Sequence, residues 1–154
     1  MYKKVLVPIM GNFSEDLAEH AIDLIDGRDV DLFVVYVIDG SVPFLTPKNI
    51  KKAMAIELKK RGKCFLEEFE NILNLSENKN ISLEKILTEG KPAEEIVRIA
   101  KEKCIDVIVM GTGKSIVDKH LLGSVSDEVV HFAPCTILLV RTIENKACEN
   151  PNSW

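Results

Sequence analysis

The chain has few of the features that identify secreted, metal-binding or nucleic-acid-binding proteins. Its 154 residues include only four cysteines and three histidines, and the formal net charge is −4. The cysteines form no CxxC pair and have no histidine beside them at the spacing of a zinc site. We expect Cys64, Cys104 and Cys135 to be small buried apolar side chains. Because nucleic-acid-binding proteins usually carry a basic excess, we expect no nucleic acid partner.

Long hydrophobic runs are also absent from the sequence. No apolar stretch reaches the length that a transmembrane helix needs, and the N-terminal MYKKVLVPI is interrupted by Pro8 and lacks a cleavage site. The densest basic run, residues 59–63, is short, and we interpret it as the solvated face of a helix rather than as a contact for nucleic acid. The sequence therefore predicts a cytoplasmic protein with no membrane partner.

What the chain does have is a regular alternation of apolar strands and amphipathic helices. Helix starts are predicted at Ser14, which we expect to cap its helix, at Thr46-Pro47, at Pro92 and near Ser124. The predicted strands cover residues 3–9, 31–39, 81–90, 105–110 and 135–141. Such βα alternation predicts a single doubly wound parallel sheet of five strands with helices on both faces. We expect this domain to span residues 1–142, followed by a polar tail over 143–154.

The second predicted helix is long. Its apolar residues recur at helical spacing, which predicts one continuous buried stripe, and Gly62 is expected to bend the helix. The members of that stripe are Ile50, Ala53, Met54, Leu58, Phe65, Leu66, Phe69, Ile72 and Leu73.

Glycines follow two of the predicted strands, at the edge where parallel sheets bind ligands. Gly11 comes after the first strand, whereas Gly111, Gly113 and Gly123 come after the fourth. The letters GTGKS at 111–115 suggest a P-loop, but that motif requires a glycine five positions before the GK pair. Position 108 is isoleucine, inside an apolar strand, so the P-loop interpretation is excluded.

Residues 90–141 resemble the universal stress protein family. The nucleotide-binding members of that family carry G-x-x-G, nine residues, and then G-S or G-T. Here nine residues separate Gly113 from Gly123, and Ser124 follows; the stretches GKPAEEIVRIAKEKCIDVIVMG and DVIVMGTGKSIVDKHLLGSVSDEVV carry the wider match. The resemblance extends over residues 2–142 and implies the strand order 3-2-1-4-5 of the adenine nucleotide alpha-hydrolase-like fold.

The resemblance also implies a site for ATP, with Mg²⁺. Backbone groups of Met110 and Val37 would hold the adenine, with Ile9 and Met10 at its border. The ribose and phosphates would lie against Gly111, Thr112, Gly113, Lys114, Gly123, Ser124 and Val125. Independently of the resemblance, glycine backbones can present N–H groups to an anion, and the start of a helix at Ser124 favours phosphate. A plain tight turn with Ser124 as a helix cap is the alternative.

Two departures from the family pattern keep a second function open. The family's first loop has an aspartate that contacts the nucleotide, and Met10 takes its place here. Gly111-Thr112-Gly113 is G-x-G rather than G-x-x-G, so the loop offers one N–H group fewer. A member of the family that has lost nucleotide binding and acts as a dimeric interaction module is therefore the alternative.

Catalysis is not expected to be the primary role. His20 and His131 fall on predicted helices and should lie at the surface, while His120 lies between the glycines and is a candidate for contact with a phosphate. No Ser/His/acid set, HExxH or DxDxDG pattern is present. A slow ATP hydrolase is thus the third possibility, after the regulatory nucleotide binder and the interaction module.

The fifth strand predicts a homodimer. In the family's strand order it lies at a sheet edge, and an apolar edge strand is an aggregation hazard unless it is covered. Family members pair this strand across a two-fold axis, so we expect a dimer through residues 136–141. Cover by the polar tail is the alternative.

Overall fold

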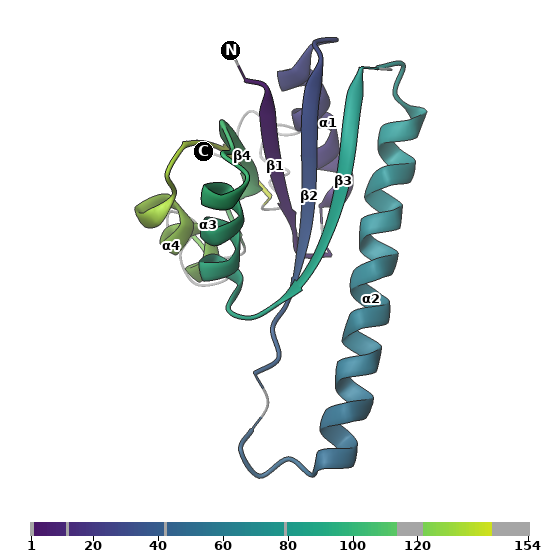
Figure 1. Cartoon of the computed structure of the whole chain (residues 1–154), viewed down its shortest axis with the longest axis vertical. Coiled ribbons are helices and arrows are strands. Elements are labelled where there is room, and N and C mark those ends of the chain that lie inside the picture. The colour runs from purple at the N-terminus through teal and green to yellow at the C-terminus, as the bar shows by residue number, and fades with distance from the viewer. Residues whose placement is uncertain (1, 12, 42, 79, 114–121, 143–154) are drawn as a thin grey trace, which may run out of the picture.

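The computed structural model describes residues 2–11, 13–41, 43–78, 80–113 and 122–142. Five strands and four helices alternate along this part of the chain (Figure 1). They are β1 (Lys4–Ile9), α1 (Ser14–Ile25), β2 (Val30–Ile38), α2 (Lys48–Leu75), β3 (Ile81–Glu89), α3 (Pro92–Glu102), β4 (Val107–Gly111), α4 (Ser124–Phe132) and β5 (Thr136–Val140). None of the described helices is long and apolar enough to cross a membrane.

The strands form one parallel sheet in the predicted order, β3-β2-β1-β4-β5. Every neighbouring pair is parallel, with Val5 of β1 opposite Leu32 of β2 on one side and Val107 of β4 on the other. The chain runs outward from β1 to β3 and then returns to β4 on the other side of β1. The order therefore reverses between β1 and β4, and the carboxyl ends of these two strands flank the switch point where such sheets bind ligands.

Both faces of the sheet are covered, which explains why the central strands are almost continuously apolar. Val5, Val7 and Ile9 of β1 face α1 and α2, in a core that includes Leu17, Leu66 and Phe69. Leu6 of β1 points to the opposite face and packs with residues of α3 and α4, among them Ile96, Ile99 and Val129. The alternation along β1 thus divides the core into two layers. Figure 1 shows α3 and α4 on one side of the sheet and α2 on the other.

The predicted caps of the first two helices were wrong. Ser14 is the first residue of α1, and the N-cap is Phe13, whose left-handed backbone (φ 60°) turns the chain into the helix. The Ser14 hydroxyl is buried and has no hydrogen-bond partner among the residues that the structure describes. Pro47 is the N-cap of α2 rather than a first-turn residue, and no side chain caps that end, so Thr46 is not a cap either. In both places the chain turns one residue away from the position that capping preferences indicate.

Helix α2 departs from its predicted pattern in two ways. Gly62 serves close packing, because a Cβ at this position would lie 2.7 Å from Leu87 Cδ1 and 2.8 Å from Tyr36 Cδ1. The predicted stripe is buried only beyond Gly62, and Ile50 and Met54 in the first half are exposed. A helix of 28 residues is about 42 Å long, whereas the nine-residue β2 is about 30 Å long, so the helix extends beyond the sheet.

The cysteines are less buried than the sequence indicated. Cys64 and Cys104 are exposed and Cys135 is half-buried; all three are free thiols. Partial burial, together with the nearby Asp106 carboxylate, raises the pKa of the Cys135 thiol. Because they are exposed, Cys64 and Cys104 do not belong to the core, contrary to the prediction.

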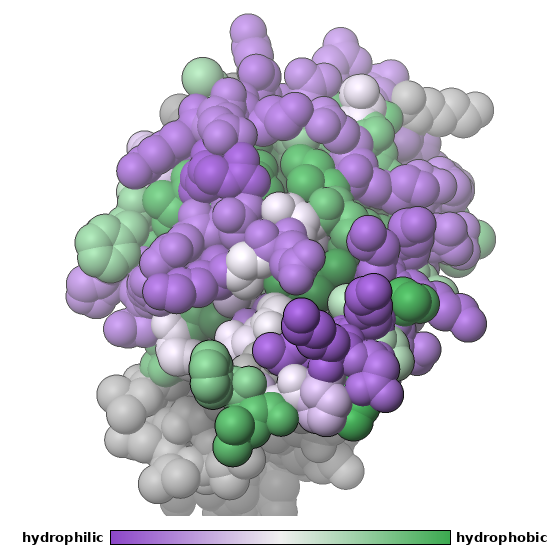
Figure 2. All heavy atoms as spheres, turned by 60° about the horizontal axis from the view of Figure 1, so that its bottom comes forward, coloured by the Kyte–Doolittle hydropathy of each residue, from purple (hydrophilic) through white to green (hydrophobic). Residues whose placement is uncertain are grey.

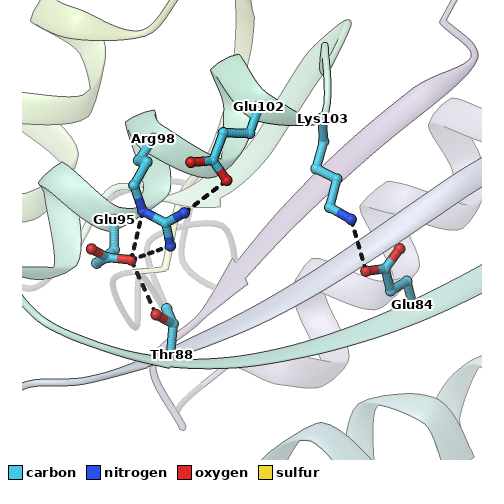
Figure 3. Close-up of polar contacts among 6 residues, drawn as sticks. All are labelled: Glu84, Thr88, Glu95, Arg98, Glu102 and Lys103. Atoms are coloured by element: carbon cyan, nitrogen blue, oxygen red, sulfur yellow. Dashed lines mark hydrogen bonds and ion pairs between the residues drawn. The ribbon is translucent and has the colours of Figure 1, made fainter.

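Polar contacts attach α3 to the edge strand β3 (Figure 3). The Glu95 carboxylate accepts hydrogen bonds from the Thr88 hydroxyl, at 3.0 Å, and from the Arg98 guanidinium, which also binds Glu102. These contacts, above all those from Arg98, lower the pKa of Glu95. A second bridge joins Lys103 Nζ to Glu84 Oε1 at 3.0 Å. The α3 helix is thereby held in place beside the carboxyl edge of the sheet.

Candidate functional site

A cavity of about 300 Å³ lies at the switch point between β1 and β4. The sequence-predicted residues that line it are Met10, Met110, Gly111, Gly113, Gly123, Ser124 and Val125. The structure adds six lining residues that the prediction did not include: Pro8, Phe13, Leu17, Ile96, Ser126 and Thr142. Residues from three strand ends and three helices therefore meet at one place.

The two halves of the glycine motif contact each other directly. A Cβ on Gly113 would lie 3.0 Å from the Cα of Gly123, and the Gly123 N–H donates a hydrogen bond to the Thr112 carbonyl oxygen at 2.8 Å. Gly113 has a positive φ of 80°, which L-residues rarely adopt, whereas Gly123 has an ordinary φ of −60°. Gly113 is thus required for its backbone conformation, and Gly123 for the close approach alone.

The start of α4 borders the cavity. Gly123 is the N-cap and makes no side-chain cap, and the exposed Ser124 is the first helical residue. The alternative that Ser124 caps the helix is therefore wrong. The first N–H groups of a helix have no partner inside it, and together with the helix dipole they favour an anion. This end of the cavity is consequently suited to a phosphate group.

Ser126 and Thr142 fix the floor of the cavity around Gly111. The buried Ser126 hydroxyl donates a hydrogen bond to the Gly111 carbonyl oxygen at 2.9 Å. The Thr142 N–H donates to Thr112 Oγ1 at 3.4 Å, and a Cβ on Gly111 would lie 2.7 Å from Thr142 Cγ2. A signal for Thr142 existed in the sequence, because it directly follows the strand predicted to lie beside the fourth. Nothing in the sequence singled out Ser126, because serine is common in a first helical turn.

The loop after β1 contributes apolar side chains to the other wall. Met10 is 55% exposed and lines the cavity together with Phe13 and Leu17. Gly11 has a φ of 92°, and a Cβ there would lie 2.7 Å from Phe65 Cζ, so α2 packs directly on this loop. This wall of the cavity is therefore apolar, and the loop is held against α2.

Not every predicted site residue reaches the cavity. Ile9 and Val37 are buried in the two core layers and do not line it. Thr112 takes part through its hydrogen bonds with Gly123 and Thr142, whereas Lys114 lies outside the described residues, as does His120.

Figure 2 views the molecule from the side of the carboxyl edge and shows a mixed surface on which hydrophobic groups interrupt hydrophilic ones.

The cavity is electrically neutral in the described part of the chain. No Asp, Glu, His, Lys or Arg lines it, and no cluster of metal-binding side chains occurs among the described residues. Asp39 follows β2 and is engaged elsewhere: hydrogen bonds from Ser41 lower the pKa of its carboxyl group. His20 and His131 are exposed, as predicted. The described residues can bind and orient a ligand but include no proton-transferring group within the cavity wall.

A parallel sheet with a glycine-rich loop at its switch point is typical of the doubly wound α/β proteins. Within that class, the sequence pattern of the universal stress protein family matches residues 1–141. A universal stress protein of Methanothermobacter thermautotrophicus is 55% identical over 143 residues, 93% of this chain and 98% of that protein. One from Methanocaldococcus jannaschii is 34% identical and covers 92% and 83%. The chain belongs to the universal stress protein family.

Solved structures show the same fold at lower sequence identity. The universal stress protein UspA from Lactobacillus plantarum superposes with a TM-score of 0.77 at 22% identity, over 91% of this chain and 98% of that one. A universal stress protein in complex with cAMP gives 0.65 at 22% identity, covering 92% and 98%. An Arabidopsis thaliana family member with AMP bound gives 0.66 at 17% identity, covering 97% of both chains. Relatives in this family thus bind adenine nucleotides.

Proposed function

We propose that this protein binds an adenine nucleotide, ATP with Mg²⁺, in the cavity between β1 and β4 and acts as a regulatory or stress-response protein. The observation that carries the proposal is the contact between Gly113 and Gly123 at the start of α4. It places bare backbone and a helix N-terminus at one end of the cavity, where backbone N–H groups would hold the phosphates.

The other lining residues fit a nucleoside. Pro8, Ile96 and Met110 offer apolar surface for a base, and the Ser124 hydroxyl is exposed beside the phosphate end. A volume of about 300 Å³ is at the lower end of the range for small-molecule sites. On this proposal Lys114 supplies a counter-charge to the phosphates.

Regulation is favoured over catalysis because the described cavity wall has no general base or nucleophilic partner. ATP should therefore remain unhydrolysed in the complex, which places a slow hydrolase last among the three functions. The exposed free thiols of Cys64 and Cys104 agree with the reducing environment of the cytoplasm, where we place the protein.

The first loop favours a second candidate, an interaction module that no longer binds nucleotide. Met10 and Phe13 line the cavity where the family has an aspartate, so a charge-assisted hydrogen bond is lost. Such a bond is worth about 1.5–3 kcal/mol, or one to two decades of affinity.

A homodimer through β5 belongs to either candidate. In the described sheet, β5 pairs only with β4, and Leu138 and Leu139 on this edge are more than one-third exposed. A second copy of the strand would cover both the leucines and the unpaired backbone groups. Leu138→Lys should then convert a dimer to a monomer in light scattering, and an unchanged mass would exclude β5 as the interface.

Isothermal titration with Mg-ATP, AMP and Mg-GTP tests the proposed ligand. Binding of ATP and AMP with much weaker binding of GTP would support an adenine site. Chromatography of the recovered ligand should return ATP rather than ADP. Absence of heat with all three nucleotides at millimolar concentration would favour the interaction module.

A further inference from the structure

The two halves of α2 have different surroundings. In the second half, Leu66, Phe69 and Leu73 are buried against the sheet. In the first half, Ile50, Met54 and Ile56 are exposed, and Figure 1 shows this half extending past the carboxyl ends of the strands. The first half of α2 therefore exposes large apolar side chains that no element of the described chain covers.

The segment that leads into α2 exposes two more large apolar side chains. Phe44 is 94% exposed and Leu45 is 89% exposed, the highest values among the large hydrophobic residues of the described chain. They lie in a turn closed by a hydrogen bond from the Thr46 N–H to the Pro43 carbonyl oxygen at 2.9 Å. We call residues 43–63 the basic arm; its tip is this turn.

Charge is concentrated on the same arm. Residues 48–63 contain seven Lys or Arg side chains and one Glu, a formal charge of +6. Because the net charge of the whole chain is −4, all other residues together carry −10. None of the seven cations forms an ion pair with a described residue. The expectation of no membrane partner rested on the absence of a long apolar run, and it did not consider this separation of charge.

The helical part of the arm has a mainly apolar and a mainly basic side, although Arg61 falls on the first and Ile56 on the second. Ile50 and Met54 are four residues apart and therefore lie on one side of the helix. Lys52, Lys59 and Lys63 fall on a different side, close together in the helical projection. Basic amphipathic helices of this type bind at the interface of anionic membranes, with their apolar side chains in the acyl boundary.

We propose that the basic arm docks the protein on an anionic lipid surface, with Phe44 and Leu45 inserted and the lysines against the headgroups. A second copy of the arm is a poor occupant because the two arms would repel each other. A nucleic acid would satisfy the cations but leave the apolar tip in water. A bilayer matches both features, and because the arm projects from the body, a flat surface can reach it.

Flotation with vesicles tests the proposal. Wild-type protein is mixed with vesicles of phosphatidylcholine containing about 30% phosphatidylserine, or with phosphatidylcholine alone, at about 0.1 and about 0.5 M salt. We expect binding to the anionic vesicles at low salt, and at least a severalfold loss of binding at high salt or without the anionic lipid.

Two arm variants and two matched controls locate the contact. Phe44→Ser/Leu45→Ser and Lys52→Glu/Lys59→Glu should each lower the partition coefficient on the order of tenfold or more. Leu75→Ser removes an equally exposed apolar side chain at the other end of α2, and Lys101→Glu reverses an exposed charge on α3; both should bind as wild type. All six substitutions in these four variants are at exposed positions, and circular dichroism checks the folding of each variant.

Three results would overturn the proposal. The first is an absence of vesicle binding by the wild-type protein at low salt. The second is an equal loss of binding in the Leu75→Ser control. The third is concentration-dependent self-association, measured by sedimentation, that the tip variant abolishes while no variant binds vesicles; it would assign the arm to a protein surface instead.

Discussion

The loop after β4 and the loop after β1 border the same cavity but offer a ligand different chemistry. The β4 side contributes backbone, with Gly113 and Gly123 in contact at the start of α4. The β1 side contributes the apolar side chains of Met10 and Phe13. On the proposed function, phosphate affinity comes from the first of these sides, and the second has lost a polar contact. Substitutions on the two sides should therefore have opposite effects.

The largest effect is expected for Gly123→Val. Even a single Cβ at this position would lie 3.2 Å from the Gly113 Cα, so a branched side chain separates the two halves of the motif. We expect at least about a hundredfold loss of Mg-ATP affinity in calorimetry, with a stability loss of about 1–3 kcal/mol from overpacking.

Two further glycine variants control this experiment. Gly123→Ala should show the same effect in weaker form, because the φ of −60° adds no backbone strain. Gly27 has a φ of 72° and no atom within 4 Å of an added Cβ, so Gly27→Ala strains the backbone without a clash. This variant should lower stability without changing nucleotide affinity. Retained affinity in Gly123→Val would remove the β4 loop from the site.

The next effect tests the β1 side in the opposite direction. Met10→Asp restores the carboxylate of the family pattern at a position that is 55% exposed and can accept a charge. Affinity for Mg-ATP should rise about tenfold or more, the value of a charge-assisted hydrogen bond. Leu75→Asp adds the same charge elsewhere as a control. Unchanged or weaker binding would mean that the β1 loop does not face the nucleotide.

A smaller effect separates binding from support within α4. Ser126→Ala removes the hydrogen bond to the Gly111 carbonyl oxygen, which costs about 1 kcal/mol and lowers Tm by about 2–4 °C. Ser124→Ala changes an exposed hydroxyl in the same turn, so it should leave Tm unchanged and weaken nucleotide binding severalfold. Melting curves and titrations of the two variants would contradict this assignment if the effects were reversed.

The smallest effect is expected at the opposite end of β1. The Asp106 carboxylate accepts hydrogen bonds from the Lys3 and Lys4 N–H groups, both at 2.9 Å, and these lower its pKa. A lowered folded-state pKa contributes stability that is present above the unfolded-state value, about 4, and is lost as pH falls through the folded-state value.

Asp106→Asn should remove that part of the acid dependence. Urea unfolding at pH 7 should show a loss of less than about 1 kcal/mol, because the group is exposed, and the difference from wild type should shrink near pH 3. Nucleotide affinity should not change. A change in affinity would mean that the cavity responds to stability in general rather than to its two loops.

The parallel sheet of five strands and the carboxyl-edge location could be predicted because they depend on local periodicity and chain connectivity, whereas the strand order was implied by the resemblance to the family. The spacing of Gly113 and Gly123 likewise indicated the β4 loop. Phe13 could not be predicted, because its left-handed N-cap conformation places an ordinary aromatic side chain in the cavity wall. Thr142 and Ser126 depend on contacts between strand ends and a helix that sequence spacing does not report.

The apolar stripe of α2 shows a second limit of prediction from the sequence. Periodicity from Ile50 to Leu73 marks which side of a helix is apolar but contains no information on where the sheet beneath it ends. The exposed first half became evident only when helix and strand lengths were compared.

A thermal melt with and without millimolar Mg-ATP shows whether the cavity between β1 and β4 binds an adenine nucleotide. A site at about a hundredfold excess over Kd gains about 2.7 kcal/mol, which raises Tm by roughly 5–10 °C in a domain of this size. We expect such a shift for the wild-type protein and none for Gly123→Val. No shift in wild type with ATP, ADP or AMP would contradict the claim and favour the interaction module.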